Sequence, residues 1–522
     1  MIFRFRNVYS GSFRMENGSR RLTWILDRPL CFFLPLQAAL LFWQLDLLPV
    51  WGDELGTLRN SALPLSDIPK ALQDDYHPPL YYLLVHLWRR IPWPMDVVTQ
   101  VRALSAVAAL LSTVALSALW LKKRDRILRT WFLALWTLSP CLVLYGRMAR
   151  AYSLQILFGL LAVAAAVRFI RNPGGRREPV LYALAAAALL YTHYAPGIAV
   201  IAGVGAVFLW KRWRDRAFRR LWNFAWANAL IAIFYIPWWS HLAKNAGEGN
   251  EEVLRVAGHA GLDHVTRLAY WFVSFSFGET LPLWAVAGGA CLAPLMAWLL
   301  WRAFRRPPEW LAVVLAVSVI GYVGVSRWVS FAFVPARLII LLPFFLLLLI
   351  EGAKRSPRAG TIACAGLLVL SVGSLSSYYR RADFLNKAYL MPNEEIAGTI
   401  NQRAVSGSDI LVMDRANTNV YAVLDRLSVD LDIISARYSD WTVKLRASMR
   451  RRPGGAVWIV RNTHDTVPAQ FHKKLETELS ATHSVRRYLF LRYSDLDRLL
   501  MPLMGWTEKP THVLQLLEFR AR

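Results

Sequence analysis

The chain has 522 residues, of which 56% are hydrophobic and 23 are tryptophan, and its mean hydropathy is +0.32. This composition excludes an ordinary soluble globular protein and is typical of a polytopic membrane protein. The formal net charge of +26 at pH 7 does not indicate a nucleic-acid partner. The basic residues cluster in short segments between apolar runs, as the positive-inside rule predicts for cytoplasmic loops.

Eleven apolar runs are candidate transmembrane helices, because most are long enough to cross about 30 Å of hydrocarbon as a helix. The runs at 179–191 and 338–350 are short for a full span, so their ends are the least certain. The eleven runs are residues 29–48, 98–121, 130–145, 152–170, 179–191, 195–210, 221–239, 281–301, 310–328, 338–350 and 361–377.

The segments between these runs alternate in charge. The segments WGDE (51–54) and THYAPG (192–197) are nearly free of Lys and Arg. By the positive-inside rule the N-terminal segment is therefore cytoplasmic and the WGDE loop is not, and eleven spans place residues 379–522 on the outer side. The basic segments are KKRDRILR (122–129), RNPGGRRE (171–178), KRWRDRAFRR (211–220), WRAFRRPPE (301–309) and EGAKRSPRAG (351–360).

The first apolar run has a basic flank like that of a secretory signal. It is long and has no small-residue cleavage pattern, so we interpret it as a retained helix. Met15 precedes a shorter basic tract, and the sequence does not decide between Met1 and Met15 as the start. The chain accordingly divides into a cytoplasmic tail (1–28), a transmembrane domain (29–378) and an extracytoplasmic domain (379–522).

The C-terminal domain alternates between helical and strand patterns. Strands are expected at SDILVMD (408–414), GAVWIVR (455–461), RRYLFLRY (486–493) and HVLQLLEF (512–519), with helical segments between the first three. Such alternation predicts a small α/β domain with a mostly parallel sheet. Neither a Walker motif nor a dinucleotide fingerprint is present.

The first outer loop carries the groups most typical of a reactive site. WGDE places Asp53 and Glu54 directly after the first apolar run, and DDYHPPLYYLLVHLW (74–88) adds Asp75 and His77. Ionisable groups at a membrane boundary cost free energy unless they bind or react with something. The alternative interpretation makes Asp53 a helix N-cap, Glu54 a solvated neighbour and His77 a residue at a helix start.

Three later outer segments contribute cations and hydrogen-bonding groups. GRMARAY (146–152) carries Arg147, Arg150 and Tyr152, YTHY (191–194) carries His193, and a further segment ends at Arg337. Arg337 is expected at a helix start, where a cation opposes the helix dipole and a ligand role is favoured. The alternatives are that Arg147 and Arg150 anchor the protein at the interface and that His193 bonds a neighbouring helix.

This division of charge suits one reaction in particular. In glycosyl transfer from a lipid-linked sugar phosphate, an acceptor hydroxyl loses a proton while a phosphate departs with growing negative charge. A carboxylate serves as the base. Fixed Arg and His donors stabilise the phosphate, because the arginine fork matches phosphate oxygens. The lipid tail accounts for a site at the membrane surface.

The three motifs WGDE, DDYHPPLYYLLVHLW and GRMARAYSLQ (146–155) together resemble those of the GT-C glycosyltransferases. The similarity is to the dolichyl-phosphate-mannose-protein mannosyltransferase type, with the Rgt-like lipopolysaccharide glycosyltransferases and the aminoarabinose transferase. It is strongest over residues 40–200. The resemblance implies an inverting hexosyl- or pentosyltransferase that uses a polyprenyl-phosphate sugar. It makes Asp53 the catalytic base or an acceptor-binding carboxylate, and it makes Arg147 and Arg150 substrate-binding residues.

The resemblance also implies a location in the cell inner (plasma) membrane, with the site facing the cell envelope. Its expected partners are membrane lipid, the lipid-linked donor and a lipid, glycan or protein acceptor, without nucleic acid. Some relatives bind a divalent metal beside the first-loop acid. Asp53 with Asp75 or His77 could supply ligands, and the metal is left unassigned. Residues 241–272 and the C-terminal domain are expected outside, where they contribute to acceptor choice.

Two alternatives come from other functional classes. A polytopic transporter or flippase of lipid-linked sugars has similar hydropathy. Such proteins tend to show inverted repeats and broken helices near the bilayer midplane, neither of which the sequence reveals. The second alternative is a non-catalytic assembly protein whose C-terminal domain binds a partner. The presence of an acidic residue together with several arginines in the outer segments argues against that interpretation.

Overall fold

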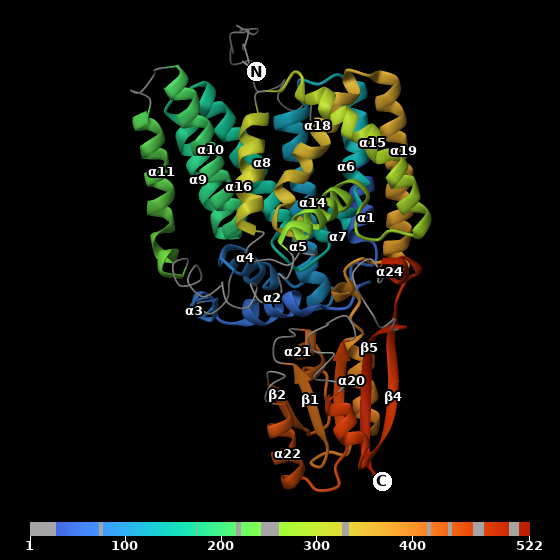
Figure 1. Ribbon diagram of the computed structural model, residues 1–522. Helices are drawn as coiled ribbons and strands as arrows, with labels where there is room; N and C mark the ends of the chain where they lie inside the picture. Colours follow the sequence, from blue (N-terminus) through green and yellow to red (C-terminus); the bar gives the residue numbers. More distant parts are fainter. Residues whose placement is uncertain are drawn as a thin grey trace.

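The protein is a helical bundle with a small sheet domain at one end (Figure 1). The part of the chain that the computed structural model describes comprises residues 28–72, 77–173, 175–215, 221–241, 260–308, 310–325, 334–414, 419–436, 441–462, 474–500 and 511–522.

The first half of the bundle follows the expected apolar runs closely, and a π-helical turn (Ser117–Leu121) extends the helix α5. Its helices are α1 (Arg28–Phe42), α2 (Gly52–Ala62), α3 (Ile68–Ala71), α4 (Leu80–Arg89), α5 (Val97–Leu116), α6 (Arg126–Thr137), α7 (Pro140–Gly146), α8 (Tyr152–Arg171), α9 (Arg177–Thr192), α10 (Tyr194–Arg214) and α11 (Leu221–Tyr235).

The second half of the bundle contains α14 (Ala260–Phe277), α15 (Leu283–Phe304), α16 (Leu311–Val325), α17 (Val334–Arg337), α18 (Leu342–Lys354) and α19 (Pro357–Tyr379). Within the described residues, five helical segments are long and apolar enough to span a membrane, and a sixth is added if α6 and α7 count as one. The expected number of eleven spans stays a prediction. The five segments are Val97–Leu121, Tyr152–Arg171, Tyr194–Arg214, Leu283–Phe304 and Pro357–Tyr379.

The expected continuous helix at 130–145 is wrong, because the chain bends by 50° between α6 and α7. Pro140 is the first residue of α7, and the Ser139 hydroxyl accepts a hydrogen bond from the backbone N–H of Leu142 at 3.3 Å. Proline lacks the donor that would continue α6, and serine caps the new helix. The absence of broken helices therefore does not argue against a transporter.

Part of the segment 241–272, which was expected to be an outer loop, belongs to the bundle. Residues 260–277 form α14, which packs against α7, α17 and α19. Residues 242–259 lie outside the described residues.

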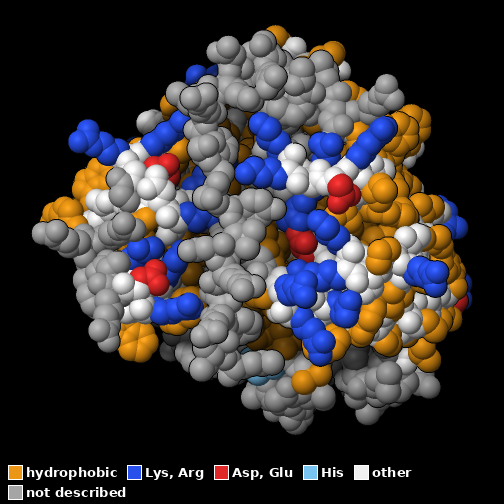
Figure 2. All heavy atoms as spheres, turned by 90° about the horizontal axis from the view of Figure 1, so that it is seen from above, with side chains coloured by type: hydrophobic (Ala, Val, Ile, Leu, Met, Phe, Trp, Pro, Cys, Tyr) orange, Lys and Arg blue, Asp and Glu red, His pale blue; other side chains and the backbone are white. Residues whose placement is uncertain are grey.

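The basic loops meet at the end of the bundle opposite the sheet domain, where Figure 2 shows many Lys and Arg side chains. Loops far apart in the sequence contact one another at this end. Arg124 forms an ion pair with Glu351, and Arg355 donates to the backbone carbonyls of Arg302 and Ala303. The charge alternation seen in the sequence thus corresponds to two distinct ends of the molecule.

The C-terminal domain is a five-stranded sheet in the order β2-β1-β3-β5-β4 (Figure 1). The strands β1, β2 and β3 are parallel, but β5 pairs antiparallel to both β3 and β4. The expected mostly parallel sheet is therefore mixed, because the apolar pattern of a strand does not encode its direction. The strands are β1 (Ile410–Asp414), β2 (Asp432–Ala436), β3 (Val457–Asn462), β4 (His483–Arg492) and β5 (His512–Ala521).

One helix precedes β1 in the sequence and others lie between the strands, and both faces of the sheet are covered. Alternate residues of β1 enter different apolar clusters, with Leu411 and Met413 on one face and Ile410 and Val412 on the other. Such alternation is expected of a strand that is buried on both faces. The helices of the domain include α20 (Asn393–Arg403), α21 (Asn419–Leu424), α22 (Trp441–Arg451) and α24 (Asp495–Leu500).

The sheet domain rests on α2, the helix that carries the WGDE motif. Val50 and Leu55 form a small apolar cluster with Ala422 of α21. The Asn393 side chain donates to the backbone carbonyl of Val50 at 3.2 Å. The acidic loop is thereby enclosed between the bundle and the sheet domain.

We expect a reporter enzyme that is active only outside the cytoplasm to be active when fused after residue 385 and inactive after residue 215. The basic loops at the opposite end orient that end towards the cytoplasm by the positive-inside rule. Reporter activity normalised to the amount of fusion protein is the measurement. The opposite pattern would place the WGDE loop on the cytoplasmic side.

Candidate functional site

The two acids of the WGDE motif lie in the first turn of α2 but point to different environments. Glu54 is 1% exposed, whereas the side chain of Asp53 is 27% exposed. Carboxylates are favoured in the first turn of a helix by its dipole. The N-cap residue is Trp51, so Asp53 is not the N-cap that the alternative interpretation required.

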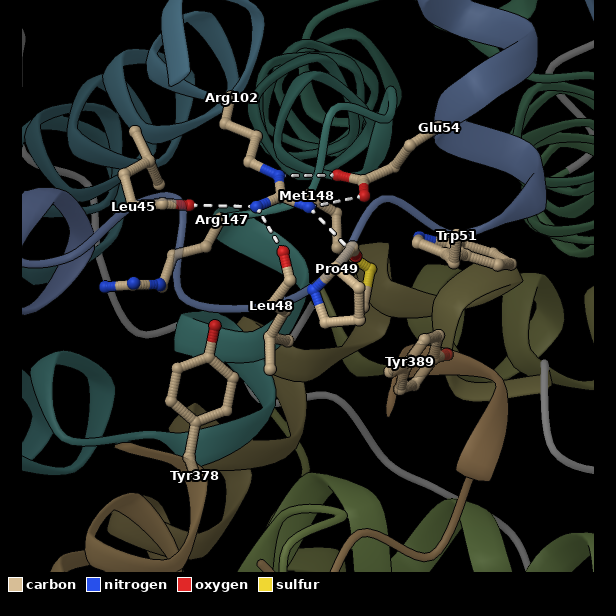
Figure 3. Close-up of a pocket in the computed structure, with 10 residues that line it drawn as sticks. All are labelled: Leu45, Leu48, Pro49, Trp51, Glu54, Arg102, Arg147, Met148, Tyr378 and Tyr389. Atoms are coloured by element: carbon tan, nitrogen blue, oxygen red, sulfur yellow. Dashed lines mark hydrogen bonds and ion pairs between the residues drawn. The ribbon is translucent and has the colours of Figure 1, made fainter. Parts of the chain in front are cut away.

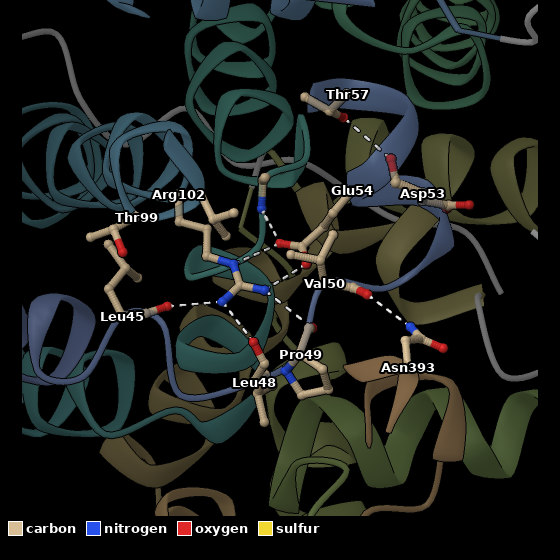
Figure 4. A network of polar contacts seen from close by, with 12 residues as sticks. Leu45, Leu48, Pro49, Val50, Asp53, Glu54, Thr57, Thr99, Arg102 and Asn393 are labelled. Atoms are coloured by element: carbon tan, nitrogen blue, oxygen red, sulfur yellow. Dashed lines mark hydrogen bonds and ion pairs between the residues drawn. The ribbon is translucent and has the colours of Figure 1, made fainter. Parts of the chain in front are cut away.

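Glu54 forms a buried ion pair with Arg102 of α5 (Figures 3 and 4). Arg102 donates from Nε and Nη2 to the two carboxylate oxygens at 2.9 and 2.7 Å. The backbone N–H of Ala149 donates to the same carboxylate at 2.6 Å. The remaining donors of Arg102 reach the backbone carbonyls of Leu45, Leu48 and Pro49 at 2.9–3.2 Å. Glu54 was expected to bind substrate, but these contacts assign it to holding the loop in place.

The guanidinium of Arg147, which Figure 3 shows in the same region as Arg102, is also surrounded by groups of the protein. It donates to the carbonyls of Leu40 and Trp43 at 2.7 and 2.6 Å and lies over the rings of Tyr378 and Tyr379. These contacts join the end of α1 to the end of α19. The expected phosphate contact of Arg147 is not supported by this position, because carbonyl oxygens and aromatic faces already surround the cation.

Five of the other expected residues, namely His77, Arg150, Tyr152, His193 and Arg337, meet in a different pocket, between α4, α8, the α9–α10 junction and α17. The pocket contains two arginines and two histidines, and the rings of His77 and His193 lie 6.1 Å apart. It is lined by His77, Tyr81, Tyr82, Arg150, Ala151, Tyr152, Gln155, Thr192, His193 and Arg337.

Arg150 joins this pocket to the exposed acid. Its Nη1 donates to the backbone carbonyl of Asp53 at 3.0 Å, and its Nη2 lies 3.6 Å from the Asp53 carboxylate. The same Nη2 lies 2.6 Å from Nε2 of His77. Because arginine can only donate, His77 accepts through Nε2 and carries its own proton on Nδ1 when neutral. The Asp53 carboxylate and the His77 ring thus both lie next to Nη2 of one guanidinium.

His193 is presented to the pocket as a neutral donor. Its Nδ1 accepts a hydrogen bond from the backbone N–H of Ala195 at 3.2 Å, so the neutral ring carries its proton on Nε2. Burial lowers the pKa of His193 well below its usual value, and the nearby charges of Arg337, His77 and Arg150 lower it further. His193 is thereby the N-cap of α10, so it bonds an adjoining helix as the alternative interpretation proposed, and its ring also lines the pocket.

Arg337 is the last residue of the short helix α17, not the first residue of a long one as expected. A cation at this end is favourable for the helix dipole, so the argument from an unfavourable dipole is wrong. Among the described residues, however, Arg337 has neither a hydrogen-bond acceptor nor a carboxylate partner. It is a half-buried cation that faces the pocket with its charge unpaired.

The described residues do not form a metal site around Asp53. No group of three His, Cys, Asp or Glu side chains gathers anywhere in the described part of the chain. Between Asp53 and His77 lies the Arg150 guanidinium, which repels a cation. Asp75, the third expected ligand, lies outside the described residues.

Sequence reasoning missed two buried groups near the site, Arg102 and Gln155. Both are polar residues within apolar runs, and that placement was the available signal, because such residues are retained for pairing or function. It also missed Glu279, which accepts hydrogen bonds from the hydroxyls of Tyr145, Tyr270 and Ser274 at 2.6–2.8 Å. Burial raises the pKa of Glu279, while these three hydrogen bonds lower it.

Comparison with known proteins identifies the fold. No family model matches the sequence, and no curated protein matches it. The chain is similar to ArnT from Cupriavidus metallidurans in the apo state, with a TM-score of 0.51 and 12% identity over 94% of this chain and 97% of that chain. The chain has the GT-C glycosyltransferase fold. The structure of the same ArnT bound to undecaprenyl phosphate matches with a TM-score of 0.49 and 12% identity, over 95% and 98% of the two chains.

The GT-C fold confirms the fold class expected from the sequence, a helical membrane protein with a small C-terminal sheet domain. The contacts of Val50 and Leu55 with the sheet domain place the WGDE motif at the junction of the two domains.

We expect Arg102→Met to lower the free energy of unfolding by about 3–5 kcal/mol, because it leaves the Glu54 carboxylate buried without a partner. The double variant with Glu54→Met should recover much of that loss, since neither charge is then buried. Denaturant unfolding of the purified protein in detergent measures both. A single variant as stable as the wild type would show that the ion pair does not hold the loop.

Proposed function

We propose that this protein is a membrane glycosyltransferase that moves a sugar, with inversion, from a polyprenyl-phosphate donor to an acceptor hydroxyl. The observation that carries the proposal is that Arg150 links the half-buried carboxylate of Asp53 to a pocket that also contains Arg337 and the neutral His193. The acceptor is a lipid, a glycan or a protein. The site would face the outside of the inner membrane, as the basic loops at the opposite end of the bundle favour.

The cationic side of the pocket suits the donor phosphate. Arg337 has no partner for its charge among the described residues, and the Nε2–H of His193 points from a buried ring with a lowered pKa. Both groups can only donate, as phosphate oxygens require. Arg150 adds a second guanidinium between the phosphate and Asp53. Fixed donors of this kind stabilise the negative charge that grows on the phosphate as it leaves.

Asp53 suits the acceptor side because it is the exposed member of the acidic pair. In the proposed step, its carboxylate takes the proton of an acceptor hydroxyl while the hydroxyl oxygen forms a bond to the anomeric carbon of the sugar. The bond from that carbon to the phosphate oxygen breaks on the opposite face, and polyprenyl phosphate leaves with the electron pair. A single displacement of this kind inverts the anomeric centre.

The direct test incubates the purified protein in detergent with a panel of polyprenyl-phosphate sugars and candidate acceptors. Mass spectrometry of the products identifies the sugar and the acceptor together. A flippase, the main alternative, would move labelled donor across reconstituted vesicles without forming a product. Movement of donor without any product across the full panel would decide for the flippase.

We expect Asp53→Asn to reduce the transfer rate by at least about a hundredfold, because it keeps the size of the side chain but removes the base. The variant should still insert and bind the donor. Initial rates at saturating donor are the measurement, with Asp67→Asn as the control, an exposed aspartate whose carboxylate pairs with Lys70. Transfer by Asp53→Asn at the wild-type rate would move the base to another residue.

We expect Arg337→Ala to weaken the binding of polyprenyl phosphate by about 1.5–3 kcal/mol, the range for a lost hydrogen bond to a charged group. Arg147→Ala is the matched control, because its guanidinium contacts the protein and not the pocket. It should lower the melting temperature and leave the affinity of the folded protein for polyprenyl phosphate unchanged. Titration of each purified variant with polyprenyl phosphate measures the affinity. If Arg147→Ala weakens binding and Arg337→Ala does not, the phosphate site has been assigned to the wrong arginine.

A further inference from the structure

Gln155 is a fully buried residue of α8 whose side chain makes no hydrogen bond with the described residues. Its side chain is 0% exposed and lines the same pocket as Arg150, His193 and Arg337. Neither its carboxamide nitrogen nor its carboxamide oxygen has a hydrogen-bond partner among the described residues. A buried amide left unpaired costs free energy, so two unpaired atoms on one side chain need a cause.

Two neighbouring polar groups of the pocket are satisfied by the protein. The hydroxyl of Tyr81 bonds that of Ser105 at 2.9 Å, and the hydroxyl of Thr192 donates to the carbonyl of Ala188 at 2.7 Å. The hydroxyl of Tyr152, which also lines the pocket, is like Gln155 buried without a hydrogen-bond partner among the described residues. The unpaired groups therefore lie one helical turn apart on α8, and Gln155 contributes both of its polar atoms to them.

The chemistry of a carboxamide differs from that of the arginines and His193, the groups of the pocket proposed to bind phosphate. Arginine and the Nε2–H of His193 only donate, which suits phosphate oxygens. A carboxamide donates through nitrogen and accepts through oxygen. Its natural complement is a group that also does both, and a sugar hydroxyl is such a group, whereas an ionised phosphate only accepts.

We propose that Gln155 forms a glycosyl subsite, in which its carboxamide binds a hydroxyl of the sugar being transferred. The subsite rests on the proposed function, because it deepens the same pocket from phosphate binding to sugar selection. Tyr152 and Gln155 are three residues apart and therefore lie on one face of α8. Gln155 would thus bind a hydroxyl of the sugar while Arg150 and Arg337 bind the phosphate beside it.

The test compares Gln155→Met, which keeps length and volume without polar atoms, with the wild type. Donors are the polyprenyl-phosphate sugar that the wild type transfers best and its monodeoxy analogues. We expect kcat/KM for the best donor to fall about 10–100-fold in the variant, and the wild-type preference over one monodeoxy analogue to disappear. Inhibition by polyprenyl phosphate without a sugar should be unchanged.

Ser153→Ala is the matched control. The Ser153 hydroxyl is likewise buried on α8 without a hydrogen-bond partner among the described residues, but it does not line the pocket. We expect this variant to keep both the rate and the sugar preference. Gln155→Leu serves as a second variant if Gln155→Met does not yield folded protein.

The outcomes separate the subsite from the proposed function. If the wild type transfers sugar and a folded Gln155 variant keeps both its rate and its preference, the subsite is wrong and the transferase stands. If both Gln155 variants lose affinity for polyprenyl phosphate without a sugar, Gln155 serves the phosphate and the subsite is also wrong. If the wild type transfers no sugar from any donor, the proposed function fails, and the subsite fails with it.

Discussion

The buried ion pair between Glu54 and Arg102 is the interaction on which the arrangement of this site depends. Glu54 binds α5 through Arg102, and it binds the turn before α8 through the backbone N–H of Ala149. Arg102 in turn binds the carbonyls of Leu45 and Leu48, in the segment between α1 and α2. Burying two charges is costly unless both are fully paired and hydrogen bonded. Here the contacts of the pair also join α2, α5, the segment between α1 and α2, and the turn before α8.

Two consequences of this pair reach the chemistry. Because Glu54 points into the protein, the preceding residue of α2, Asp53, lies on another side of the helix and stays exposed at its carboxylate. Because Ala149 is held against Glu54, the next residue, Arg150, is placed beside Asp53. One buried carboxylate therefore sets the position of both the proposed base and the cation next to it.

The same turn shows how two similar residues acquire different roles. Arg147 and Arg150 lie three residues apart, yet Arg147 is held by the carbonyls that end α1 and by the tyrosines of α19, while Arg150 faces the pocket. The first stabilises the junction of the bundle, and the second remains next to reactive groups. The sheet domain completes this junction, since its Asn393 binds the backbone immediately before the WGDE motif (Figure 4).

The sequence alone determined the class of the protein and most of its candidate site. Apolar runs, basic loops and strand–helix alternation follow from local composition, so the helical membrane domain and the C-terminal α/β domain could be predicted. Ionisable groups beside apolar runs identified Asp53, His77, Arg150, His193 and Arg337. Only the tertiary structure separated these residues from Glu54 and Arg147.

The reason is that a role depends on which partner satisfies each charge, and that partner comes from a distant element. Arg102 lies 48 residues from Glu54, and Tyr379 lies 232 residues from Arg147. The break at Pro140 and the direction of β5 were likewise decided by packing. Sequence patterns report which residues are costly to bury, whereas the fold decides which of them are paired and which remain for a ligand.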